Sequence, residues 1–218
     1  MKRLLLLLCL LASPVTGETP RVLTIGDSIM DWNGAGSIPQ VMARELGWDL
    51  RDESVAGARL KHPLRLLVGP MDIRAQVPRL EFEWIVMTGG GNDLAADCNC
   101  GDCDDTLDEL VTADGTFGAM PDFLDLMDER GARVLYVGYY ENPVGGGPFS
   151  GCEDAIGTLE SRIESLAAAR DGFDMIDASD IYDNADLTLY DADRLHPSPK
   201  GSALLGTWIA KELLARTP

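Results

Sequence analysis

Residues 21–28 read Arg21-Val22-Leu23-Thr24-Ile25-Gly26-Asp27-Ser28, an apolar, β-rich run that ends in a Gly-Asp-Ser turn. A short apolar run before turn residues predicts a buried strand over 21–25. The turn then places Ser28 at the start of a helix, with its hydroxyl at the edge of a sheet and its amide at a helix N-terminus. Ser28 is therefore a candidate nucleophile, although Asp and Ser after a strand are also common helix caps.

Four further β-rich runs follow this first one and alternate with helical patterns. They are residues 49–55, 84–88, 133–139 and 173–176. The clearest helices cover 155–170, with apolar residues at steps of three and four, and the segment after Ser198, which can cap a helix ahead of Pro199. Alternating strands and helices predict an α/β fold with a five-stranded, mainly parallel sheet covered on both faces. Active sites in such a sheet lie at the carboxyl ends of the strands.

The start of the chain and its charge limit where the protein works and what it binds. Lys2 and Arg3, an apolar run over 4–12 and then small residues predict a signal peptide over 1–17, followed by one domain over 18–218. Nine apolar residues are too few to cross a bilayer, so we expect no stable membrane anchor and a secreted or periplasmic location. The formal charge of −18 predicts no nucleic-acid partner, because polyphosphates would be repelled. Nothing in the sequence indicates an oligomeric state.

A serine nucleophile needs a base, and the chain has only two histidines, His62 and His196. His196 ends the sequence Asp193-Arg194-Leu195-His196, just before the last predicted helix. A carboxylate three residues back in a tight loop can bind Nδ1 and leave Nε2 free for the serine proton. His62 has no such carboxylate nearby in the sequence. We therefore predict that His196 is the base for Ser28 and that Asp193 orients His196.

Two other strand ends carry residues suited to stabilising an oxyanion. Residues 89–93 read Gly-Gly-Gly-Asn-Asp after the third predicted strand, and the Asn92 carboxamide is a donor there. Residues 54–58 read Ser-Val-Ala-Gly-Ala after the second, where Gly57 offers an unhindered amide. Each is an ordinary strand-end turn when taken alone. Together they place donors, a serine and an Asp/His pair at neighbouring strand ends.

In this order, the blocks at Ser28, Gly57, Asn92 and 193–196 resemble the SGNH (GDSL-type) hydrolases. The resemblance spans residues 22–196. It implies a flavodoxin-like three-layer α/β/α sandwich and serine esterase chemistry with no metal or other cofactor. It also implies an oxyanion hole made by the Ser28 amide, the Gly57 amide and the Asn92 side chain. Residues 29–34 depart from the family pattern, because Ile-Met-Asp-Trp-Asn-Gly replaces the usual Leu-Ser/Thr-x-Gly.

The function predicted on this basis is a secreted serine esterase acting on a small-molecule or carbohydrate ester. O-acylated carbohydrates and small acyl or aryl esters all fit the motifs. The alternative is a catalytically silent module of the same fold that binds envelope or extracellular polysaccharide. The complete set of Ser28, base and oxyanion donors favours the enzyme.

Three residues near the predicted site are candidates for substrate binding: Trp32, Arg59 and Tyr140. Trp32 and Tyr140, with Tyr139, would form an aromatic wall, although aromatics at strand ends more often complete a core. Arg59 belongs to a basic segment, 59–65, for which ion pairing with nearby carboxylates is favoured over an anionic subsite.

Four cysteines of the mature chain, Cys98, Cys100, Cys103 and Cys152, could form a zinc site or two disulfides. In an exported chain, disulfides are the better interpretation. The first three follow the third predicted strand and Cys152 follows the fourth, and these strands are neighbours in the implied sheet. We therefore expect Cys152 to bond one of the other three, without specifying which.

Overall fold

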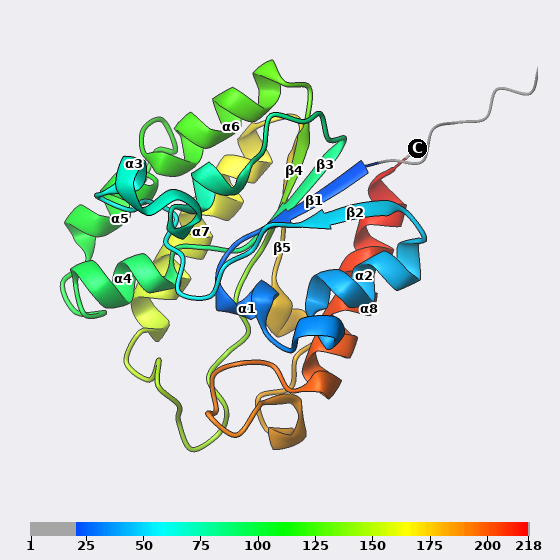
Figure 1. Cartoon of the computed structure of the whole chain (residues 1–218). Coiled ribbons are helices and arrows are strands. Elements are labelled where there is room, and N and C mark those ends of the chain that lie inside the picture. The colour runs from blue at the N-terminus through cyan, green and yellow to red at the C-terminus, as the bar shows by residue number, and fades with distance from the viewer. Residues whose placement is uncertain (1–20, 218) are drawn as a thin grey trace, which may run out of the picture.

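The computed structural model describes residues 21–217, so the predicted signal peptide over 1–17 lies outside the described residues. One parallel sheet forms the centre of the fold, with strand order β2-β1-β3-β4-β5 (Figure 1). Its strands are β1 (Arg21–Ile25), β2 (Asp49–Asp52), β3 (Trp84–Met87), β4 (Arg133–Val137) and β5 (Phe173–Ile176). All four strand pairings are parallel. This arrangement confirms the predicted α/β fold.

Helices cover both faces of the sheet and leave its carboxyl edge to the loops (Figure 1). The α-helices are α1 (Ser28–Asp31), α2 (Ile38–Leu46), α3 (Arg65–Val68), α4 (Gly91–Asp97), α5 (Asp104–Leu110), α6 (Ala119–Glu129), α7 (Glu153–Ala169) and α8 (Pro199–Arg216). The 3-10 helices are η1 (Gly34–Gly36), η2 (Gly69–Met71), η3 (Ile73–Gln76), η4 (Ala178–Asp180) and η5 (Leu187–Leu189). Ser198 caps α8 as predicted, because its Oγ accepts from the Gly201 N–H at 3.1 Å.

The alternation of side chains along the strands divides the core into two layers. Leu23, Ile25 and Tyr136 lie on the face packed by α4, α5, α6 and α7. Val22 and Leu135 lie on the opposite face, packed by α1, α2 and α8. The central strand β3 is buried at every residue, as expected where helices cover both faces. The predicted three-layer sandwich is therefore confirmed.

Three strands end earlier than the sequence predicts, and the third of the chain, expected over 84–88, ends one residue early at Met87. The second strand was expected over 49–55, but β2 ends at Asp52, whose Oδ1 accepts from the backbone and side chain of Ser54 at 3.1 and 2.6 Å. The Val55 N–H still donates to the Gly26 carbonyl at 3.1 Å, so this segment stays beside the turn that follows β1. The fourth strand, expected over 133–139, ends at Val137.

Beyond Val137, a carboxylate from α7 holds the chain. Glu160 Oε1 accepts from the Tyr139 N–H at 2.6 Å. Burial raises the pKa of Glu160 to about 7, against the hydrogen bond from Tyr139, and the charge of Asp177 raises it further. Because this pKa is higher in the folded chain than in the unfolded one, ionisation of Glu160 opposes folding. The stability it contributes is present below about pH 4.5 and is lost as the pH rises to about 7.

We therefore expect Glu160→Gln to become more stable relative to the wild type as the pH rises. The glutamine oxygen can still accept from the Tyr139 N–H, but it carries no proton to release. Between pH 5 and pH 8 the difference in unfolding free energy should move in favour of the variant by about 2 kcal/mol, discounted for partial exposure. Urea unfolding of both proteins at the two pH values measures it. An equal difference at both values would contradict the assignment.

Candidate active site

Ser28 is the first residue of α1 and lies just beyond the carboxyl end of β1. The preceding turn depends on Gly26, whose φ is +145° and where a Cβ would come within 2.7 Å of Thr88 Oγ1. Gln76 holds both sides of this glycine, because it accepts from the Gly26 N–H at 2.7 Å and donates to the Gly26 carbonyl at 2.9 Å. No local sequence pattern identifies Gln76, which lies 50 residues further along the chain. The Gln76 side chain thus holds the turn that leads into Ser28.

A chain of hydrogen bonds joins Asp193, His196 and Ser28. His196 Nδ1 lies 2.5 Å from Asp193 Oδ2, and Nε2 lies 2.8 Å from Ser28 Oγ. Because a carboxylate can only accept, Nδ1 carries the proton and Nε2 accepts from the serine hydroxyl. Asp193 Oδ1 also accepts from the N–H groups of Leu195 and His196, both at 3.0 Å. The structure therefore brings together the three side chains selected from the sequence.

Asp193 is set up to remain ionised in this arrangement. Burial acts to raise its pKa, but the hydrogen bonds from His196 and the backbone outweigh burial and hold the pKa below its usual value. The other histidine lies in a different setting, because His62 Nδ1 accepts from the Leu64 N–H at 3.1 Å. His196 is thus the histidine that the structure places beside Ser28.

Asn92 follows β3 and Gly57 follows β2, the two strands that flank β1 in the sheet. Asn92 Nδ2 donates one hydrogen to the Ala58 carbonyl at 2.9 Å, which leaves its second hydrogen for another acceptor. This bond ties Asn92 to the residue that follows Gly57. Gly57 itself has φ +78°, a conformation that favours glycine. Asn92 and Ser28 line the same cavity.

Asp93 holds the segment that follows Gly57. Its carboxylate is buried and accepts from the N–H groups of Leu60 at 2.8 Å and Lys61 at 2.9 Å. Burial raises the pKa of Asp93 to about 7, although these hydrogen bonds and the charge of Arg59 act to lower it. Asn92 and Asp93 therefore both bind the same loop, through a side-chain donor and a side-chain acceptor.

Buried Asp27 and half-buried Tyr139 join the serine turn to the start of α4. The Tyr139 hydroxyl donates to Asp27 Oδ2 at 2.7 Å and accepts from the Gly91 N–H at 3.1 Å. Asp27 Oδ1 caps α1 by accepting from the Ile29 N–H at 3.0 Å. Burial raises the pKa of Asp27 despite these hydrogen bonds. The aromatic-wall prediction did not foresee this use of Tyr139.

A cavity of about 50 Å³ opens beside Ser28. Its lining is mostly apolar and comes from the site and the loop after β4: Asp27, Ser28, Ile29, Gly91, Asn92, Tyr139, Tyr140, Glu141, Asn142, Pro143, Phe149, Ile156, Tyr190, Arg194 and Leu195. Tyr140 is among them, as the substrate-wall prediction requires. Its hydroxyl also donates to the Leu195 carbonyl at 2.7 Å, and its ring stacks on Tyr182. Tyr140 thus supports the loop that carries His196.

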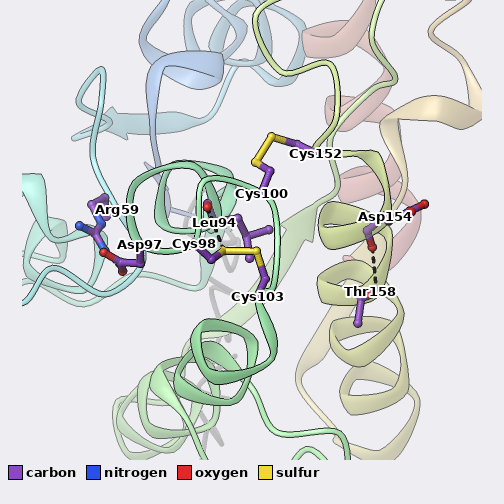
Figure 2. Close-up of a disulfide and its surroundings, with 9 residues drawn as sticks. All are labelled: Arg59, Leu94, Asp97, Cys98, Cys100, Cys103, Cys152, Asp154 and Thr158. Atoms are coloured by element: carbon purple, nitrogen blue, oxygen red, sulfur yellow. Dashed lines mark hydrogen bonds and ion pairs between the residues drawn. A yellow bond between two sulfur atoms is a disulfide. The ribbon is translucent and has the colours of Figure 1, made fainter.

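Trp32 and Arg59 have contacts that the substrate-binding predictions did not anticipate. The Trp32 ring stacks on the His196 imidazole, and the described cavity lining does not include it. Arg59 pairs with Asp97 of α4 (Figure 2), and its Nε lies 3.8 Å from Asp93 Oδ1. The geometry thus favours ion pairing over an anionic subsite for Arg59, as the sequence analysis preferred. Lys61 is likewise paired, with Glu109 at 2.8 Å.

Two disulfides join the ends of α4, α5 and α7. Cys98 is bonded to Cys103, and Cys100 to Cys152 (Figure 2). The prediction that Cys152 bonds one of the other three cysteines is confirmed. The second bridge fixes the end of the loop after β4 just before α7 begins, and part of this loop lines the cavity.

Within residues 21–217, no group of three or more His, Cys, Asp or Glu side chains is arranged to hold a metal ion. None of the helices in this part of the chain is both long and apolar enough to cross a membrane.

An α/β sandwich with a serine, a histidine and an aspartate at its carboxyl edge is typical of hydrolases. The model of the GDSL-like Lipase/Acylhydrolase family matches residues 24–204 of this chain. The chain therefore belongs to that family. A comparison with curated protein sequences gave no match.

Solved structures share the fold at low sequence identity. A protein from Slackia heliotrinireducens, described as an SGNH hydrolase, has a TM-score of 0.65 and 19% identity, and the match covers 90% of this chain and 100% of that one. A carbohydrate acetylesterase from Sinorhizobium meliloti has a TM-score of 0.61 and 17% identity, covering 91% and 100%. An aryl esterase from M. smegmatis has a TM-score of 0.60 and 18% identity, covering 90% and 99%. At these identities the likeness shows the fold alone.

Proposed function

We propose that this protein is an exported serine esterase that hydrolyses esters with short acyl groups. The observation that carries the proposal is the hydrogen-bonded chain from Asp193 through His196 to Ser28. Ser28 is the nucleophile, His196 the general base and Asp193 the group that orients and stabilises the imidazolium. Export is supported by the two disulfides, which persist in oxidising compartments.

The reaction is an acyl transfer to Ser28 and then to water. Ser28 Oγ attacks the ester carbonyl while its proton passes to His196 Nε2. The backbone N–H groups of Ser28 and Gly57 and the second Asn92 Nδ2 hydrogen stabilise the oxyanion, and a donor of this kind typically contributes about 3 kcal/mol. The proton on Nε2 then goes to the leaving alcohol. Water, deprotonated by His196, then attacks the acyl carbonyl, and the acid leaves as His196 returns the proton to Ser28 Oγ.

The cavity size supports a short acyl group. Holding one water takes roughly 10 to 15 Å³ of cavity volume. The cavity beside Ser28, at about 50 Å³, matches a short acyl group on this scale, whereas a longer chain would have to continue into the adjoining cavity of about 520 Å³, which is lined in part by Glu141, Asn142 and Glu153. Acetyl to butyryl groups fit this space, as found in O-acetylated carbohydrates and small aryl esters. The names of two structural neighbours, a carbohydrate acetylesterase and an aryl esterase, agree with these substrates.

Covalent labelling with a fluorophosphonate separates the enzyme from a silent polysaccharide-binding module. We expect one adduct per chain, located on Ser28 by peptide mass spectrometry, and none in Ser28→Ala. Labelling of a different residue, or no labelling of correctly folded protein, would refute the proposed nucleophile.

Acyl chain length is expected to decide the rate. With p-nitrophenyl esters, kcat/KM should fall at least about 100-fold from butyrate to octanoate, because the longer chain loses the apolar contacts and orientation of a cavity it cannot enter. Phe149→Ala is the matched variant, since Phe149 is part of the lining and is half-buried. It should raise octanoate hydrolysis relative to acetate. Equal rates for acetate and octanoate in the wild type would contradict a short acyl site.

A further inference from the structure

Trp32 lies four residues after Ser28, at the end of α1, and its ring faces the imidazole of His196. The ring centroids are 3.8 Å apart and the planes differ by 9°. The two imidazole nitrogens lie in the ring plane and reach Asp193 and Ser28. Trp32 therefore covers a face of the ring while the hydrogen bonds occupy its edge.

A carboxylate outside the triad fixes the position of the indole. Trp32 Nε1 donates to Asp191 Oδ2 at 2.8 Å. This hydrogen bond and one from the Ala192 N–H hold the pKa of Asp191 below its usual value, so the carboxylate is ionised at neutral pH. The Asp191 N–H donates to the His196 carbonyl at 2.8 Å. Asp191 thus binds both the Trp32 indole and the backbone of His196, the residue that the indole covers.

The next residue strengthens this connection. Asn33 Nδ2 donates to the Pro197 carbonyl and to Ser202 Oγ, each at 2.8 Å. Trp32 and Asn33, which follow Ser28, are therefore hydrogen-bonded to the chain both before and after His196. Residues 29–34 are also where the sequence departs from the usual family pattern, so the indole is a feature of this chain rather than of the motif.

We propose that Trp32 is a positioning residue for the esterase reaction, which fixes the plane of the His196 ring and stabilises its positive charge when it takes the serine proton. The face of an indole attracts a cation, and the attraction grows where water is excluded. The stack thus favours the imidazolium over the neutral ring. Asp27, Asp191 and Asp193 are the carboxyl groups whose charges interact with the same ring, and all three remain in a Trp32 variant. This inference rests on the proposed function.

The test compares pH profiles of kcat/KM for a neutral ester in the wild type, Trp32→Phe and Trp32→Leu. We expect Trp32→Leu to lose about 10- to 30-fold in kcat/KM, mainly in kcat, and its acid limb to move about 0.5 to 1 pH unit lower. Trp32→Phe keeps an aromatic face, so both changes should be smaller. A rise in KM with the acid limb unmoved would overturn the proposal and make Trp32 a substrate contact. An unmoved limb with reduced kcat would also overturn it.

Tryptophan fluorescence provides a readout that needs no activity. An imidazolium stacked on an indole quenches its emission, so wild-type emission should fall in a one-proton step as the pH is lowered. The step should vanish in His196→Ala and Trp32→Phe and persist in Trp48→Phe, the control at another half-buried tryptophan. No step in a protein that hydrolyses esters would overturn the role of Trp32. A normal step in a protein with no esterase activity or fluorophosphonate adduct would instead refute the proposed function.

Discussion

Ser28→Ala is expected to lower kcat/KM for a short-chain p-nitrophenyl ester at least about 10⁴-fold, the scale seen when a serine triad loses its nucleophile. His196→Ala should be as damaging, because the hydroxyl would then have no base 2.8 Å away. The loss is non-additive in a triad, so the double variant should be no worse than either single one. Initial rates at neutral pH, with protein folding checked by circular dichroism, measure all three.

His62→Ala is the matched control for the loss of a histidine. His62 Nδ1 accepts from a loop N–H and is not bonded to Ser28, so kcat/KM should stay within about twofold of the wild type. The kcat/KM of Asp193→Asn should lie between those of His62→Ala and His196→Ala, because the imidazole remains but loses its charged partner. An inactive His62→Ala beside an active His196→Ala would contradict the proposed base.

Much of this site could be predicted from sequence because parallel strands end at a common edge. Ser28, Gly57 and Asn92 follow three neighbouring strands, so predicting the strands already places these residues close together. Asp193 and His196 could be predicted from sequence for another reason. Their spacing of three lets one carboxylate bind both the ring and the backbone N–H of the histidine.

Contacts between distant segments could not be predicted in the same way. The sequence places Trp32 near Ser28, but the direction of its ring depends on Asp191, 159 residues away. Gln76 likewise holds Gly26 from a 3-10 helix that carries no catalytic motif. In both cases the decisive hydrogen bond joins segments that no periodicity or spacing relates, so only their placement in space shows it.

The disulfide pairing was open in the sequence for a similar reason, since four cysteines allow three pairings. In the structure, Cys98 directly follows α4 and Cys103 directly precedes α5, with Cα atoms 5.2 Å apart. That short turn leaves Cys100 at its tip for Cys152. The ends of two helices thus decide a pairing that the order of the strands alone leaves open.

The two disulfides should differ in their effect on stability, because they close loops of different length. Cys100 and Cys152 are 52 residues apart, whereas Cys98 and Cys103 are 5 apart. On a loop-entropy basis, removing the long bridge should cost about 4 kcal/mol of unfolding free energy and removing the short one about 2 kcal/mol. For a domain of this size, the expected drop in Tm is about 8 to 16 °C for the long bridge and half as much for the short one.

The matched variants are Cys100→Ser with Cys152→Ser, and Cys98→Ser with Cys103→Ser. Each replaces two sulfur atoms by hydroxyls, so the difference between the pairs reports mainly on the loops.

The long bridge also fixes the loop after β4, where the carbonyls of Val144 and Gly146 accept from the Arg194 guanidinium at 2.6 and 2.9 Å. Arg194 lies between Asp193 and His196. Losing the long bridge should therefore lower kcat/KM even at temperatures well below Tm, where the variant is still folded, and losing the short bridge should not. Thermal unfolding and initial rates on the two variants test both effects. Equal losses of Tm, or a larger loss of activity in the short-bridge variant, would contradict this account of how the loop supports the triad.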